Sequence, residues 1–162
     1  MQKNKLFVIM GVSGTGKTTI GTLLSEELGI PFFDGDDFHP ECNITKMSAG
    51  QALTDEDRYD WLLALHHLLN TKKESGAIVA CSALKEVYRD ILKKDIEEEL
   101  RFIYLQGSHE EVKSRMKLRK GHFMPLDLLK TQFQTLEEPK ECIKVSIAGP
   151  PKEIVQNILK QI

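Results

Sequence analysis

The sequence has little cysteine and no long apolar run, and each scarcity narrows what the protein can be. Its three cysteines, Cys42, Cys81 and Cys142, are widely spaced in 162 residues and match no disulfide or metal-binding pattern. The longest apolar runs, Leu6–Met10 and Ala77–Cys81, are far shorter than the roughly 20 residues that a membrane-spanning helix needs. The sequence therefore predicts a cytoplasmic protein with reduced thiols and no membrane partner.

An excess of positive charge is also missing. The 22 lysines and arginines are outnumbered by 24 aspartates and glutamates, which gives a net charge of −2. General nucleic-acid-binding proteins usually carry a net positive charge, so we expect no nucleic-acid partner. The hydrophobic fraction of 41% and the charged fraction of 28% are ordinary for a globular protein. The length fits one domain over residues 1–162.

Apolar segments of strand length alternate with segments of helical pattern along the whole chain. The expected strands are Lys5–Met10, a short one at Phe32–Phe33, Ala77–Cys81, Arg101–Leu105 and Ile143–Ile147. The expected helices are Lys17–Leu28, one from a capped start at residues 54–57 to near Gly76, Leu84–Leu92, one from a capping box at residues 108–111 to about Lys120, Pro125–Leu136 and Pro151–Ile162. This alternation predicts an α/β fold in layers, with a mainly parallel sheet whose apolar strands are covered on both faces.

The most specific motif lies between the first expected strand and the first expected helix. It matches the pattern G-x-x-x-x-G-K-[ST] at every fixed position. Glycines let such a loop curl so that successive backbone N–H groups point at phosphate oxygens, and the following helix N-terminus favours the same charge. We therefore expect ATP phosphates on the loop, with Lys17 reaching the outer phosphates and Thr18 holding Mg²⁺. The loop consists of Gly11, Val12, Ser13, Gly14, Thr15, Gly16, Lys17 and Thr18.

A phosphate-binding loop is shared by switch GTPases, motor ATPases and kinases. The chain is short for a motor, and it contains no N-K-x-D string of the kind that reads guanine. These two absences favour a small kinase.

An acidic turn, Asp34-Gly35-Asp36-Asp37, follows the second short strand. Loops at the carboxyl ends of parallel strands form the binding crevice of such a sheet, so we expect this turn beside the phosphate-binding loop. One carboxylate can help hold Mg²⁺ and its water shell, and the other can accept a proton from an attacking hydroxyl. The sequence leaves open whether Asp34 or Asp36 is the base. Asp and Gly are also common in solvated turns, which is the alternative reading.

Cations follow the ends of two expected strands. Lys85 and Arg89 are four residues apart and are expected on one helix face, and Arg58 lies near the start of the preceding helix. Such a group could bind an acidic substrate. A single surface cation is more often only solvated, so the prediction depends on the group.

A second group of cations surrounds Gly121. Arg115 and Arg119 have the same spacing of four residues, and Lys120 and His122 flank the glycine. On a mobile segment they could close over the transferring phosphoryl group. We therefore expect a small lid over about residues 115–136.

Taken together, the motifs resemble the gluconate kinase (gluconokinase) family, small P-loop kinases similar in fold to shikimate and adenylate kinases. The resemblance covers most of the chain up to Pro139, and its segments occur in family order. They are MGVSGTGKTT at Met10–Thr19, FDGDDFHPECNITKMSAGQALTDEDRYDWL at Phe33–Leu62, CSALKEVYRDIL at Cys81–Leu92, FIYLQG at Phe102–Gly107, RKGHFM at Arg119–Met124 and QFQTLEEP at Gln132–Pro139.

The resemblance implies phosphorylation of D-gluconate at its 6-hydroxyl by ATP with Mg²⁺. It further implies a three-layer P-loop kinase fold, with a five-stranded parallel sheet, helices on both faces and a helical lid, and commonly a homodimer. Asp34 and Asp36 would lie where substrate and metal meet, with Lys17 and Arg119 also catalytic. The implied substrate pocket holds Asp36, His39, Lys46, Arg58, Lys85, Arg89 and the lid residue His122, and the implied lid cations are Arg115, Arg119 and Lys120.

The sequence leaves two other functions open. Another small-metabolite kinase, such as a shikimate kinase, would share the loop but need a different acceptor pocket. A nucleotide-binding regulator would bind ATP without any phosphoryl acceptor. Stimulation of ADP release by a sugar acid separates these readings.

Overall fold

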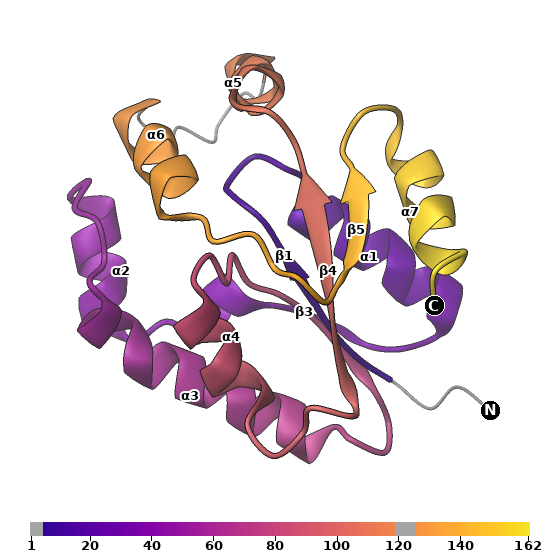
Figure 1. Ribbon diagram of the computed structural model, residues 1–162. Helices are drawn as coiled ribbons and strands as arrows, with labels where there is room; N and C mark the ends of the chain where they lie inside the picture. The colour runs from indigo at the N-terminus through magenta and orange to yellow at the C-terminus, as the bar shows by residue number, and fades with distance from the viewer. Residues whose placement is uncertain (1–4, 119–125) are drawn as a thin grey trace.

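A parallel sheet of five strands forms the centre of the molecule (Figure 1). The computed structural model describes residues 5–118 and 126–162. The strands are β1 (Leu6–Met10), β2 (Phe32–Asp34), β3 (Ala77–Ala80), β4 (Leu100–Gln106) and β5 (Ile143–Ser146). They lie in the order β2-β3-β1-β4-β5, and every neighbouring pair is parallel. The predicted α/β fold with a five-stranded parallel sheet is confirmed.

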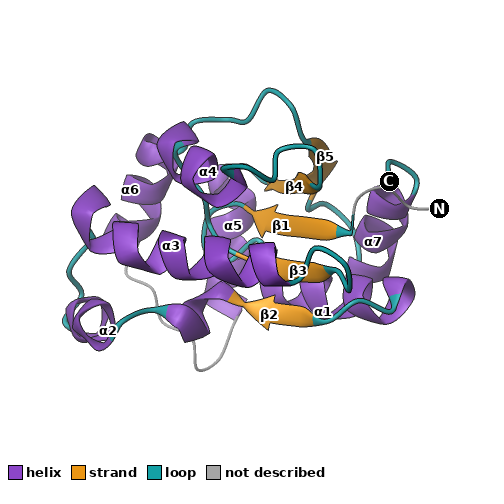
Figure 2. Cartoon of the chain, turned by 90° about the horizontal axis from the view of Figure 1, so that it is seen from below, coloured by secondary structure: helices purple, strands orange, loops and turns teal. Residues whose placement is uncertain are grey.

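Helices connect the strands and cover the sheet. They are α1 (Lys17–Leu28), α2 (Glu41–Ser48), α3 (Asp55–Thr71), α4 (Glu86–Lys93), α5 (His109–Leu118), α6 (Leu126–Thr135) and α7 (Pro151–Leu159), with a short 3₁₀ helix, η1 (Gly35–Phe38), after β2. Figure 2 shows the strands side by side, with the arrowheads of β1, β2 and β4 toward the same end. The loops that follow the strands therefore gather along one edge of the sheet.

The core lies on both faces of the sheet, because successive side chains of a strand point to opposite faces. Phe7 and Ile9 of β1 are fully buried in a cluster with side chains of α1 and α7. Val8 and Met10 are fully buried in a second cluster with side chains of α3 and α4. These helices thus form the outer two of three layers, as the apolar strands predicted.

Two predicted helix caps are present. The Thr54 hydroxyl accepts a hydrogen bond from the Asp57 backbone N–H, and the Asp57 carboxylate accepts one from the Thr54 N–H. Ser108 and Glu111 make the same reciprocal pair at the start of α5. Each pair satisfies two backbone donors that the first helical turn leaves without partners.

One helix was missed, and several predicted helix boundaries are wrong. Helix α2 was not predicted, because the residues after Pro40 have no clear apolar stripe. Helix α4 begins at Glu86 rather than at residue 84, because Ala83 takes a left-handed backbone with φ 44° and Lys85 stays extended. Helix α3 ends at Thr71, before the predicted end near Gly76.

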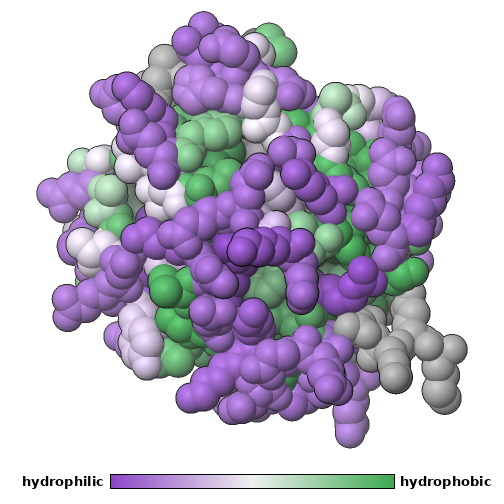
Figure 3. All heavy atoms as spheres, viewed as in Figure 1, coloured by the Kyte–Doolittle hydropathy of each residue, from purple (hydrophilic) through white to green (hydrophobic). Residues whose placement is uncertain are grey.

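The surface is mainly polar. Figure 3 shows hydrophilic residues over most of the visible face, with apolar residues in the recesses between them. Within residues 5–118 and 126–162, no helix combines the length and the apolar character needed to cross a bilayer.

Candidate active site

The phosphate-binding loop connects β1 to α1. Gly14 and Gly16 have φ angles of 84° and 92°, a region that side chains rarely adopt, and Gly16 ends the loop as the N-cap of α1. The Lys17 ammonium group lies over the loop, where it donates to the carbonyls of Gly11 at 2.9 Å and Val12 at 3.0 Å. The loop thus combines a curled backbone, a helix N-terminus and a cation, which together favour phosphate.

The first carboxylate of the acidic turn meets the loop directly. The Thr18 hydroxyl donates to Asp34 Oδ2 at 3.2 Å, and Asp34 Oδ1 accepts from the Asp36 backbone N–H at 3.0 Å. This second bond caps η1 and fixes the turn. The predicted neighbourhood of the loop and the turn is therefore present.

The side-chain oxygens of Thr18 and Asp34 are suitable ligands for a Mg²⁺ ion that also binds nucleotide phosphates. Mg²⁺ prefers oxygen ligands, and it usually takes one or two from the protein while phosphates and waters supply the rest. In the described part of the chain, no three His, Cys, Asp or Glu residues are grouped to hold a metal ion. The donor set thus suits a metal shared with phosphates, rather than one enclosed by protein.

Gly35 is needed because the turn lies against β3. A Cβ atom at this position would lie 2.2 Å from the carbonyl oxygen of Ala80. The Gly35 carbonyl also accepts a hydrogen bond from the Trp61 indole at 2.7 Å. The turn is thus held from two sides, which sets the positions of Asp34 and Asp36.

A cavity of about 440 Å³ opens between the loop, the turn and α6. Its polar walls include Lys17, Thr18, Asp34, Asp36, His39, Arg58, Ser82 and Gln132. Further lining comes from the segment between α2 and α3 and from Trp61 and Leu128. The cavity therefore joins a phosphate site to a mixed acidic and basic wall.

Asp36 is a carboxylate with an altered proton affinity. Its side chain is 83% exposed to the open cavity. Although the side chain is largely exposed, the protein atoms around it reduce its hydration and so raise its pKa, with a further rise from the negative charge of Asp34, while Lys17 acts in the opposite direction. A raised pKa favours proton acceptance during catalysis.

His39 and Arg58 form the opposite wall. The His39 ring stacks on Trp61 with 4.0 Å between the ring centroids. Burial, and then the Arg58 charge, lower the pKa of His39 to about 4, so its ring is neutral near pH 7. Arg58 donates to the Tyr88 hydroxyl at 3.0 Å, and Tyr88 donates in turn to Asp55. The wall thus carries one firmly held cation.

Three other predicted substrate cations do not line this cavity. Lys46 is paired with Asp57 at 2.8 Å, and Lys85 with Asp55 at 3.0 Å. Arg89 is buried, and it donates to the carbonyls of Ala83 and Glu137. The expectation that Lys85 and Arg89 share a helix face is wrong, because Lys85 is the extended N-cap of α4. Their role in substrate binding stays a prediction.

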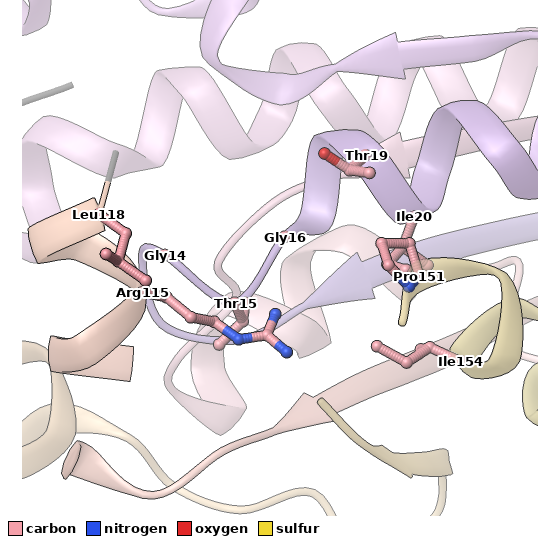
Figure 4. Close-up of a pocket in the computed structure, with 9 residues that line it drawn as sticks. All are labelled: Gly14, Thr15, Gly16, Thr19, Ile20, Arg115, Leu118, Pro151 and Ile154. Atoms are coloured by element: carbon pink, nitrogen blue, oxygen red, sulfur yellow. The ribbon is translucent and has the colours of Figure 1, made fainter. Parts of the chain in front are cut away.

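Arg115 lies at a second cavity of about 270 Å³, on the other side of the loop. Figure 4 shows its guanidinium group beside Thr15, with Ile154 and Pro151 of α7 across the cavity. The guanidinium donates to the carbonyl of Ile147. Arg119, Lys120 and His122 lie outside the described residues, so the lid and their roles in it stay predictions.

Four polar contributors to the site were missed in the sequence. Tyr88 holds Arg58, and Asn43 contacts His39 at 3.3 Å. Gln132 accepts from the Ser13 backbone N–H at 2.7 Å, and the Ser82 carbonyl accepts from the Gly11 N–H. All four lie in segments of the family resemblance, which was the available signal. Tyr88, Gln132 and Ser82 have partners remote in sequence, so spacing could not have identified them. Asn43 is four residues from His39, but helix α2, which carries it, was not predicted.

Comparison with known proteins agrees with this geometry. Residues 13–162 match the family model described as shikimate kinase. The thermosensitive gluconokinase of Escherichia coli (strain K12) is 50% identical over 137 residues, which cover 83% of this chain and 72% of that protein. The gluconokinase of Gluconobacter oxydans (strain 621H) is 42% identical over 163 residues, which cover 98% of this chain and 91% of that protein.

Solved structures give the same relationship. A gluconokinase from Sinorhizobium meliloti 1021 superposes with a TM-score of 0.92 at 43% identity, covering 99% of this chain and 92% of that one. A shikimate kinase from Aquifex aeolicus vf5 has a TM-score of 0.64 at 22% identity, covering 96% and 94% of the two chains, and shares the fold alone. The phosphate-binding loop, the acceptor cavity beside it and these relatives together show that the chain belongs to the gluconokinase family of P-loop kinases.

Proposed function

We propose that the protein transfers the γ-phosphate of ATP to the 6-hydroxyl of D-gluconate, giving 6-phospho-D-gluconate and ADP. The observation that carries the proposal is one cavity bordered both by the phosphate-binding loop and by the acidic turn. Relatives named gluconokinase, at 50% and 42% identity, support the choice of substrate.

The loop residues Gly11–Thr18 would bind the ATP phosphates. Their backbone N–H groups and the Lys17 ammonium would stabilise negative charge on the transferring group. Thr18 and Asp34 would hold Mg²⁺, which would neutralise negative charge on the phosphates. Arg115, with Arg119 from the lid, would add positive charge on the outer side.

Asp36 would be the base. Its carboxylate lines the cavity, and its pKa is raised, whereas Asp34 is already engaged by Thr18 and by the Asp36 N–H. Asp36 would accept the hydroxyl proton as the phosphoryl group is transferred. The choice between the two carboxylates, which the sequence left open, thus falls on Asp36.

The substrate wall suits a small anion with many hydroxyls. Arg58 supplies a positive charge for a carboxylate, while His39 and Asp36 offer neutral and anionic hydrogen-bonding groups. Lys46, Lys85 and Arg89 would contribute only if they leave their present partners, and His122 would contribute from the proposed lid. The cavity volume of about 440 Å³ accommodates a six-carbon acid beside a phosphate.

A shikimate-kinase-like activity is the second candidate, favoured by the family model that matches residues 13–162. The solved shikimate kinase is 22% identical, which supports a common fold and not a common substrate. A regulator without a phosphoryl acceptor would not need Asp36 and Arg58 in the cavity. A cytoplasmic location, a homodimer and the absence of nucleic-acid partners stay predictions.

The product tests the proposal. After reaction with Mg-ATP and D-gluconate, a phosphate ester at the terminal carbon gives a ³¹P signal split by two protons. An ester at any secondary hydroxyl gives a signal split by one proton, and this would contradict the assigned position. Absence of any ester, with ATP still bound, would contradict the kinase reaction.

A further inference from the structure

His39 is held among three side chains, those of Trp61, Asn43 and Asp36. Its ring is stacked on Trp61 with an interplanar angle of 17°, and its side chain is 3% exposed. Asn43 of α2 lies at one ring nitrogen, Nδ1, at 3.3 Å. The other nitrogen, Nε2, faces Asp36 Oδ1 at 3.7 Å. The two nitrogens thus have different neighbours, and the position of the ring hydrogen decides what each can do.

The contacts of Asn43 determine that position. Asn43 is fully buried, and its amide nitrogen donates to the backbone carbonyl of Asp57 at 2.8 Å. A carbonyl can only accept, so the NH₂ end of the amide faces Asp57 and also faces His39. An NH₂ group can only donate, so His39 Nδ1 is the acceptor. In the neutral ring the hydrogen is therefore on Nε2, toward Asp36.

We propose that Asn43 locks His39 in the tautomer with hydrogen on Nε2, and that this N–H orients the Asp36 carboxylate toward the acceptor hydroxyl. Asn43 and His39 are positioning residues in this account. The inference rests on the proposed function, because it takes Asp36 as the base. The 3.7 Å separation is longer than a hydrogen bond, and catalytic hydrogen bonds often shorten when substrate binds.

The surroundings keep this donor neutral. Burial, and then the charge of Arg58, lower the pKa of His39 to about 4. A neutral donor can orient the Asp36 carboxylate without placing a positive charge against it.

The tautomer is measurable in the unmodified protein. ¹⁵N signals of histidine rings distinguish a bare nitrogen from one that carries hydrogen. We expect His39 Nδ1 to be bare and Nε2 to carry hydrogen. His66 is an internal control, because its Nδ1 lies 3.0 Å from the carbonyl of Leu92 and must donate to it. Hydrogen on His39 Nδ1 would overturn the proposal.

Asn43→Asp tests the lock with little change in shape. The new carboxylate accepts rather than donates, so hydrogen should move to His39 Nδ1 and leave a bare Nε2 facing Asp36. At about pH 8.5, above the usual pKa of histidine, we expect kcat to fall about tenfold or more, with the KM for ATP within about twofold. Asn70→Asp makes the same change at an exposed position of α3 and should keep full activity. An inverted tautomer with unchanged kcat would overturn the positioning role.

If Asn43→Asp does not fold, a pair of His39 variants replaces it. Glutamine carries an NH₂ group near the position of Nε2, whereas asparagine is too short to reach it. We expect His39→Gln to retain about tenfold more kcat than His39→Asn, and equal losses would overturn the proposal. The tautomer readout needs no activity, so a failed lock and a failed gluconate reaction give different results.

Discussion

At the scale of single residues, the central assignment is that Asp36 acts as the base. Asp36→Asn keeps the shape of the side chain but cannot accept the proton. We expect kcat to fall by about 10²–10⁴-fold, with the KM for ATP within about twofold.

Asp37→Asn is the matched control for this assignment. Asp37 is also exposed, but it does not line the cavity, so its kcat should stay within about threefold of the unmodified protein. Equal effects of the two substitutions on gluconate-dependent ADP release would contradict the role of Asp36.

The sequence identified candidate residues whose chemistry lies in one local motif, and it missed several whose contacts are distant in the chain. Gly11–Thr18 and Asp34 were predicted because their chemistry lies in one motif or at one strand end. Tyr88 and Gln132 were missed because their partners, Arg58 and Ser13, are 30 and 119 residues away in the chain. Lys85 was misplaced because helical spacing says nothing about where a helix begins.

At the scale of elements, the acidic turn depends on its contact with β3. Gly35→Ala would place a Cβ atom 2.2 Å from the Ala80 carbonyl, which is backbone and cannot move aside easily. We expect the free energy of unfolding, measured with urea, to fall by about 2 kcal/mol. Activity should fall by more than the decrease in the folded fraction explains. Gly50 has a left-handed backbone with φ 75°, and a Cβ atom there meets nothing within 4 Å. Gly50→Ala therefore shows the effect of an added Cβ atom without a clash. Unchanged stability of Gly35→Ala would contradict the tight contact.

The junction of α2 and α3 predicts a dependence of stability on pH. Hydrogen bonds from Lys46, and then from the Thr54 backbone, lower the pKa of Asp57 from 3.8 to about 2. The unfolded chain therefore takes up the proton first as the pH falls. The stabilisation is nearly complete above about pH 5, and it is lost as the pH falls through 3.8 toward 2.

Asp57→Asn removes this dependence. We expect its Tm to lie below that of the unmodified protein at about pH 5, and the gap to shrink as the pH falls toward about 2. Asp60→Asn, an exposed carboxylate on the same helix, serves as the control. A gap that stays constant over this range would show that Asp57 titrates normally.

At the scale of the whole molecule, Arg89 connects the chain after α6 to the rest of the fold. It donates to Ala83 O at 2.7 Å and to Glu137 O at 2.8 Å, and the Glu137 N–H donates to the carbonyl of Leu84 at 2.8 Å. Arg89→Met would leave two carbonyls without a charged donor, so we expect the free energy of unfolding to fall by about 3 kcal/mol.

A surface arginine provides the comparison for Arg89. Arg101 donates to the carbonyl of Gln161 at 3.2 Å in an exposed position. Arg101→Met should therefore cost less than about 1 kcal/mol. Similar losses for the two variants would contradict the structural role of Arg89.

The layered fold was predictable because most strands are mainly apolar on both faces, although β5 alternates buried and exposed residues, and because each strand is followed by a helical segment. Five parallel strands were expected from the family resemblance, and the alternation alone predicted only a mainly parallel sheet. The order of the strands was not predictable, because it depends on which strands pair with β1. Helix α2 was missed because its few apolar residues form no stripe.

One measurement tests the central claim most directly. ADP release by the purified protein with Mg-ATP would be compared with and without D-gluconate, related sugar acids and shikimate. We predict strong stimulation by D-gluconate and almost none in Lys17→Ala, which lacks the loop cation. Stimulation by another acid would keep the kinase chemistry and contradict the substrate. No stimulation by any acid, with nucleotide still bound, would contradict the account.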